Sequence, residues 1–129
     1  MRAVFVPLAI ATMLAACSSP SSLLAEMHAD DMSGESIKLL LENGLTLKLR
    51  GEKHTGKIRL EADGTAFGRA QLDSGKELDL SGTWVIEDDK FCRKWKFNNF
   101  KRVCETWRRT SETEVEILID GRSAGFNSW

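Results

Sequence analysis

The stretch "KFCRKWKFNNFKRVCETWRR", residues 90–109, holds two runs of alternating apolar and polar residues around a pair of asparagines. Asparagine tolerates a positive φ angle, so Asn98-Asn99 predicts a turn between two antiparallel strands. For residues that face each other across such a hairpin, the two residue numbers always add up to the same value. Cys92 and Cys104 fit a hairpin whose loop has an odd number of residues and is centred on Asn98.

This register predicts a disulfide between Cys92 and Cys104. In a directly opposed, non-hydrogen-bonded pair the Cβ atoms lie near the roughly 3.8 Å that a disulfide requires. The chain has no C-x-x-C motif, so a thioredoxin-like redox pair is not expected. The same register sets two further pairs opposite each other: Lys94 with Arg102, and Lys96 with Phe100.

Alternation of apolar and polar residues continues on both sides of the hairpin, at residues 45–49, 58–62, 78–80 and 115–119. This period is typical of half-buried strands. Turn signals separate the runs: Asp63-Gly64, Asp73-Ser74-Gly75, Glu87-Asp88-Asp89 and Asp120-Gly121. Their short spacing makes consecutive strands antiparallel neighbours. We therefore predict a mainly β fold, a small antiparallel meander of seven or eight strands that forms a barrel or a flattened sandwich.

One short N-terminal helix is expected before the first strand, over residues 35–43. Ser33 is a good N-cap, and Gly44 suits the position after the C-terminus. Ile37, Leu40 and Leu41 have the spacing of one helical face. A helix this short needs the domain to stabilise it.

The N-terminus has the pattern of an export signal over residues 1–16, with Arg2 followed by a short apolar segment. The residues "LAAC" that end at Cys17 resemble the lipobox of bacterial lipoproteins, in which the cysteine is lipidated and becomes the new N-terminus. The alternative is an ordinary secretory signal cut near Ala16. By resemblance to Gram-negative lipoproteins, Ser18 after the cysteine implies the periplasmic face of the outer membrane.

This interpretation divides the chain into three parts. Residues 1–16 are the signal peptide, residues 17–32 form a lipidated flexible tether, and residues 33–129 form a single β-rich domain. An exported domain lies in a compartment where a disulfide persists.

The hairpin is strongly basic, because residues 90–109 hold eight Lys or Arg side chains and one acid, Glu105. Aromatic residues lie between the cations, so the hairpin is a candidate binding face for anionic lipid or an acidic envelope protein. The candidate binding residues are Arg93, Lys94, Trp95, Lys96, Lys101 and Arg102. The alternative is that Trp84, Trp95 and Trp107 are core residues and the cations solvate an outer face.

Three further patterns, "DGTAFG" (63–68), "GTWVIEDDKFC" (82–92) and "KW" (94–95) followed by Cys104 and Trp107, resemble a family of small exported alphaproteobacterial proteins of unknown function. The resemblance covers residues 33–121 and implies a secreted β-rich domain with a disulfide hairpin and no activity. The chain is more distantly similar to periplasmic protease-inhibitor lipoproteins, in which an N-terminal arm comparable to residues 18–32 plugs the protease cleft.

The sequence favours a binding or inhibitory module of the cell envelope over an enzyme. It lacks a nucleophile elbow and a Gly-rich phosphate loop, and His28 and His54 supply too few ligands for a zinc site, so neither a cofactor nor a metal is expected. The alternatives are a structural envelope lipoprotein and a carrier of an apolar ligand in the barrel. The expected partners are the membrane, through the lipid anchor, and an envelope protein or anionic lipid, but not nucleic acid; the chain is expected to be a monomer.

Overall fold

A computed structural model describes residues 28–129 of the chain. The predicted signal peptide, Cys17 and the predicted tether as far as residue 27 lie outside the described residues. Among the described residues, no helix is long and apolar enough to cross a bilayer.

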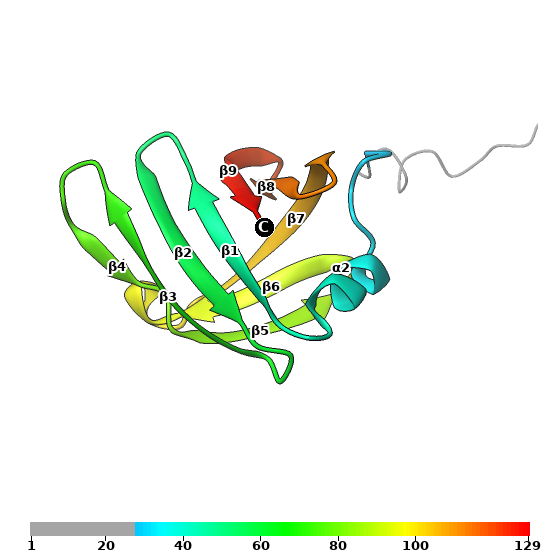
Figure 1. Cartoon of the computed structure of the whole chain (residues 1–129), viewed down its shortest axis with the longest axis horizontal. Helices are drawn as coiled ribbons and strands as arrows, with labels where there is room; N and C mark the ends of the chain where they lie inside the picture. Colours follow the sequence, from blue (N-terminus) through cyan, green and yellow to red (C-terminus); the bar gives the residue numbers. More distant parts are fainter. Residues whose placement is uncertain (1–27) are drawn as a thin grey trace, which may run out of the picture.

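Within this part of the chain, nine antiparallel strands form one sheet that closes on itself (Figure 1). The strands are β1 (Leu45–Arg50), β2 (His54–Leu60), β3 (Thr65–Leu72), β4 (Glu77–Asp79), β5 (Gly82–Glu87), β6 (Lys90–Trp95), β7 (Arg102–Ser111), β8 (Glu114–Ile119) and β9 (Arg122–Ser128). Pairing of β2 with β3, and of β1 with β9, closes a ring of eight strands. The short β4 is the additional strand. The predicted mainly β fold is confirmed, in its barrel form.

β4 and β5 lie one after the other along the same edge of β3. β4 pairs with residues 69–71 of β3, and β5 pairs with Thr65 and Ala66 at the start of β3. Leu80, between the two strands, donates its backbone N–H to the carbonyl oxygen of Gly68. The chain therefore follows β3 almost continuously and needs no long connection.

The predicted helix is present as α2 (Gly34–Leu41), slightly shorter than expected at its C-terminal end. The Ser36 N–H donates to Ser33 Oγ at 3.1 Å, which confirms the predicted cap. Gly44 has a φ of +73°, which a residue with a Cβ rarely adopts. Ile37 and Leu41 are buried, and α2 packs against β5 and β6 at one end of the barrel (Figure 1).

Large aromatic side chains fill the barrel between α2 and the middle of the strands. The rings of Phe91 and Trp107 have centroids 4.9 Å apart, and both side chains are almost completely buried. Trp84 is half-buried and donates its Nε1–H to the carbonyl oxygen of Glu61 at 3.1 Å. An aromatic side chain buries more apolar area than any aliphatic one, so these residues contribute much of the stability of a small domain.

The packed domain begins earlier than the predicted boundary at residue 33. Met32 is buried in the core, and its N–H donates to the carbonyl oxygen of Trp107 at 2.8 Å. The Arg108 Nε–H donates to Asp31 Oδ1 at 2.8 Å, and the Asp31 side chain is only 3% exposed. These contacts hold residues 30–32, which the sequence analysis assigned to the tether, against β7.

Candidate binding site at the open end of the barrel

The hairpin of β6 and β7 has the predicted disulfide and most of the predicted register. Cys92 is bonded to Cys104, and Lys94 lies opposite Arg102. The predicted pairing of Lys96 with Phe100 is absent from the register, because the chain leaves β6 in a short 3₁₀ turn, η1 (Lys96–Asn98). Asn99 and Phe100 then adopt φ angles of +52° and +57°, so the turn lies where the asparagine pair indicated.

The six candidate binding residues do not form one face. Alternation along β6 directs Arg93 and Trp95 into the barrel, where they are 9% and 8% exposed, and leaves Lys94 between them exposed. The other candidates, Lys96, Lys101 and Arg102, are also exposed. The prediction treated the hairpin as a single basic surface and overlooked this division. Arg93 belongs to the interior.

Inside the barrel, Arg93 forms a buried ion pair with Glu105 of β7. Its Nε–H donates to Glu105 Oε2 at 2.6 Å, and the two side chains are 10% and 4% exposed. The other carboxylate oxygen, Oε1, accepts the Nε1–H of Trp107 at 3.1 Å. Because both carboxylate oxygens accept hydrogen bonds from fixed donors, Glu105 holds the guanidinium in one position.

The Arg93 guanidinium also stacks on the indole ring of Trp95, with its central carbon 3.9 Å from the ring centroid. Two buried nitrogens of this pair, Arg93 Nη1 and Trp95 Nε1, have no hydrogen-bond acceptor among the described residues. Buried donors of this kind are rare in folded proteins, because losing water without gaining a partner costs free energy. A water molecule or a ligand oxygen beside them would supply the missing acceptor.

Arg93 and Trp95 border a cavity of about 220 Å³. Apolar side chains supply most of its wall: Leu49, Leu72, Leu78, Leu80, Phe97 and Phe126. The polar side chains beside them are Arg93, Glu105, His54 and Asn127. Small-molecule sites usually have an apolar wall with a few polar groups in it.

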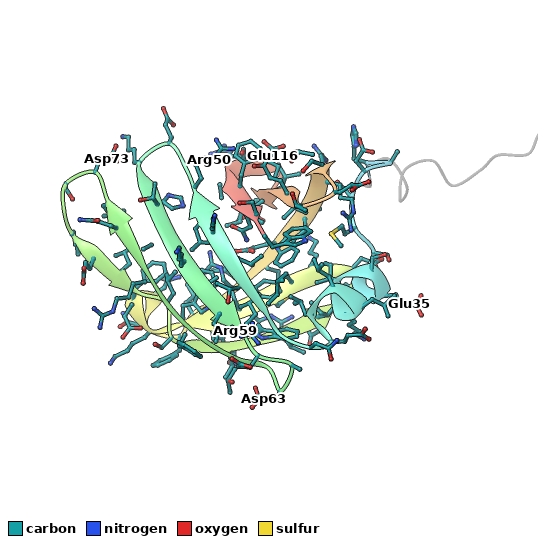
Figure 2. The ribbon with its side chains drawn as sticks, in the orientation of Figure 1. Glu35, Arg50, Arg59, Asp63, Asp73 and Glu116 are labelled. Carbon is teal, nitrogen blue, oxygen red and sulfur yellow. A yellow bond between two sulfur atoms is a disulfide. The ribbon has the colours of Figure 1, made fainter. Side chains whose placement is uncertain are left out.

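The cavity lies at the end of the barrel away from α2. It is lined by Leu49 near the end of β1 and by His54 at the start of β2, whereas α2 leads into the opposite end of β1 at Leu45. Figure 2 marks the same two ends by Asp63 and Asp73, which lie in the turns before and after β3. α2 packs at one end of the barrel (Figure 1). The residues that line the cavity, such as His54 and Phe97, lie at the other end.

Glu105 is the functional candidate that the sequence analysis missed, although a signal for it was present. In the predicted register, odd-numbered residues of β6 and odd-numbered residues of β7 share a face. Phe91 and Trp107 are almost completely buried, so Arg93 and Glu105, which share their face, also face the interior. Charged residues are almost never fully buried unless they are paired. For this reason the burial of Arg93 and Glu105 was not predicted.

Among residues 28–129, no cluster of His, Cys, Asp and Glu side chains has the arrangement of a metal site. His54 lines the cavity, whereas His28 contacts Asp30 on the exposed N-terminal segment. Comparison of the chain with protein-family models, with curated proteins and with solved structures finds no match.

Proposed function

We propose that the protein is an exported binding protein, tethered to a membrane through a lipid on Cys17, that holds a small and mainly apolar molecule in its barrel. The proposal joins the location expected from the sequence to the cavity at the open end of the domain. Of the functions considered from the sequence, it favours the ligand carrier and the binding module, and it moves the binding site from the hairpin surface to the barrel interior.

The observation that carries this proposal is the pair of unpartnered donors beside an apolar cavity. An eight-stranded barrel has an interior just wide enough to be filled by side chains or to hold one small ligand. In this barrel the half near α2 is filled by aromatic side chains, and the other half keeps a cavity of about 220 Å³. A molecule that filled it would bury apolar surface and satisfy the donors together.

The outer surface of the hairpin is a weaker candidate, because several of its cations already have acidic partners. Arg102 forms an ion pair with Glu87, and Lys96 Nζ lies 3.8 Å from Asp79 Oδ2. These pairs reduce the charge available for an anionic lipid or an acidic protein. They also agree with the alternative in which these cations solvate an outer face.

The test is to fill the cavity from within and measure binding of a simple apolar probe. Ala70 of β3 is buried and lines the cavity, so Ala70→Leu places extra atoms inside it. Gln71, the next residue, is exposed and faces outward, so Gln71→Leu is the matched control. We expect toluene to shift the indole N–H resonance of Trp95 in the wild type and in Gln71→Leu. In Ala70→Leu we expect no shift.

Folding of each variant is checked by its thermal melting curve. A folded Ala70→Leu protein that binds toluene as well as the wild type would contradict the proposal. So would a wild-type protein that shows no toluene shift and, when purified from its own membrane, carries no bound small molecule in native mass spectrometry. That second result would favour the structural envelope protein instead.

A further inference from the structure

The charge balance of the cavity restricts the kind of ligand that fits it, provided that the proposed ligand-binding function is correct. Three ionisable side chains line the cavity: His54, Arg93 and Glu105. The Arg93 charge is already matched by Glu105, with 2.6 Å between Nε and Oε2. A carboxylate ligand would therefore add a negative charge with no positive partner of its own, in a region of low dielectric where an unpaired charge is costly.

Two of the residues that line the cavity carry an unpartnered polar group, and both groups are donors. Arg93 Nη1 and Trp95 Nε1 carry N–H groups and have no acceptor among residues 28–129. Since the Arg93 guanidinium lies over the Trp95 ring, with 3.9 Å between its central carbon and the ring centroid, the two donors belong to one compact group. A carbonyl oxygen has two lone pairs and accepts two hydrogen bonds without carrying a net charge.

The volume sets the size of the apolar part. A dry cavity of about 150 Å³ in another protein is large enough to bind benzene. The cavity of about 220 Å³ in this barrel therefore has room for one ring with a short substituent. The rings of Trp95 and Phe97, with centroids 6.4 Å apart, both border it and offer flat surfaces for such a ring.

From charge, donors and volume together, we infer that the barrel binds a neutral molecule with one ring or an equally small apolar group and a carbonyl oxygen, and that it discriminates against carboxylates of the same shape. The carbonyl oxygen accepts from Arg93 and Trp95. The apolar part lies against the leucines and aromatic rings of the wall.

The experiment compares three single-ring probes on the wild-type protein by calorimetric titration and by the Trp95 indole resonance: toluene, and the more closely matched pair of benzamide and benzoate. We expect benzamide to bind about tenfold more tightly than toluene, since it alone of these two offers an acceptor. We expect benzoate to bind more weakly than benzamide. The titrations are repeated with His54→Gln, so that a charge on the imidazole does not account for the order.

A charge variant then reverses the selectivity. Glu105→Gln removes the negative charge and keeps one acceptor oxygen, which serves either Arg93 or Trp107. Benzoate should then gain affinity relative to benzamide. If Glu105→Gln does not fold, the order of affinities of the three probes for the wild-type protein tests the inference alone.

The outcomes separate this inference from the proposed function. Benzoate binding more tightly than benzamide, or toluene as tightly as benzamide, overturns the inference and leaves a ligand-binding barrel. An unchanged selectivity in folded Glu105→Gln also overturns the charge argument. If none of the three probes binds the wild type and no small molecule is found bound to the protein purified from its own membrane, the proposed function itself fails.

Discussion

At the scale of single residues, the buried pair of Arg93 and Glu105 is the feature that sets this barrel apart from a purely apolar one. Two charges removed from water gain little net stability from each other, because the desolvation cost offsets their attraction. Removing only one of them is different, since the other is left buried and unpaired. The free energy of unfolding of variants at these two residues therefore measures the cost of an unpaired charge inside the barrel.

We expect Glu105→Met to lower the free energy of unfolding by about 3–5 kcal/mol, and the double variant Arg93→Met/Glu105→Met to lower it by less. Urea unfolding followed by tryptophan fluorescence measures both values. The control is Glu87→Met, which breaks a pair with Arg102 whose side chains are 46% and 48% exposed. There the loss is expected to be about 1 kcal/mol or less. A double variant that is less stable than Glu105→Met would show that Arg93 stabilises the fold even without Glu105, and would contradict this expectation.

Asp63, in the turn between β2 and β3 (Figure 2), gives a prediction about pH. Its carboxylate accepts hydrogen bonds from the Thr65 hydroxyl at 2.6 Å and from the Thr65 N–H at 2.9 Å, and these bonds, the hydroxyl first, lower the pKa of Asp63. A pKa that is lower in the folded state stabilises the fold above the unfolded-state pKa. That stabilisation is lost as the pH falls through the folded-state pKa.

Asp63→Asn should therefore be less stable than the wild type at pH 7, and the difference should shrink as the pH falls below about 4. Urea midpoints at pH 7 and at pH 3 measure the two differences. Asp73→Asn, in the exposed turn after β3, is the control and should show little change at either pH (Figure 2). A difference between Asp63→Asn and wild type that is the same at both pH values would assign the effect to turn geometry instead of charge.

At the scale of the elements, the strands and turns could be predicted because each left a local pattern in the sequence. Asp120 and Gly121 adopt φ angles of +51° and +76° in the turn between β8 and β9, as the Asp-Gly pair indicated. Gly82, in the "GTW" pattern, begins β5 where a Cβ would overlap the carbonyl oxygen of Lys94 on β6. Contacts between distant segments, such as Asp31 with Arg108, left no local pattern and could not be predicted.

The prediction from sequence also failed to place the charged side chains of Arg93 and Glu105 inside the barrel, and this was its larger error. The alternation of β6 was visible, but charged residues were assigned to the solvent on general grounds. For that reason Arg93 was grouped with Lys94 and Arg102, although the register places Arg93 on the same face as Phe91. The cavity could not be predicted either. It depends on which side chains fill a closed barrel, which local patterns do not determine.

The outer face of β1, β2 and β3 carries a row of cations that gives an element-scale prediction. Lys57 of β2 lies directly opposite Lys48 of β1 on one side and Arg69 of β3 on the other. Like charges in directly opposed positions destabilise a sheet. We expect Lys57→Glu to raise the free energy of unfolding by about 0.5 kcal/mol at low salt, and the gain to fall as salt screens the charges.

Urea unfolding at two salt concentrations measures this effect. The control is Lys76→Glu, which makes the same change of net charge in the turn between β3 and β4, outside the paired strands. An equal gain in both variants would mean that overall charge, not the row across the strands, is responsible.

At the scale of the whole molecule, the N-terminal segment and the cavity lie at different ends of the barrel. The described chain begins beside β7, through Asp31 and Arg108, and passes directly into α2 (Figure 1). The cavity opens at the other end, near His54 and Phe97. A lipid anchor attached before residue 28 would therefore hold the domain by its packed end and leave the binding end free.

This arrangement predicts that anchoring and binding are independent. Cys17→Ser removes the sulfur that the lipid would need, so we expect the protein to move from the membrane fraction to the soluble exported fraction. Its melting temperature and its affinity for toluene should stay the same, because the described residues that line the cavity lie between Leu49 and Asn127, far along the chain from Cys17. Intact mass spectrometry of the wild type should find the lipid, with the chain beginning at residue 17. If Cys17→Ser still sediments with membranes, another part of the protein holds it there. The basic outer face of the barrel, which the Lys57→Glu variant alters, is then the first surface to test against anionic vesicles.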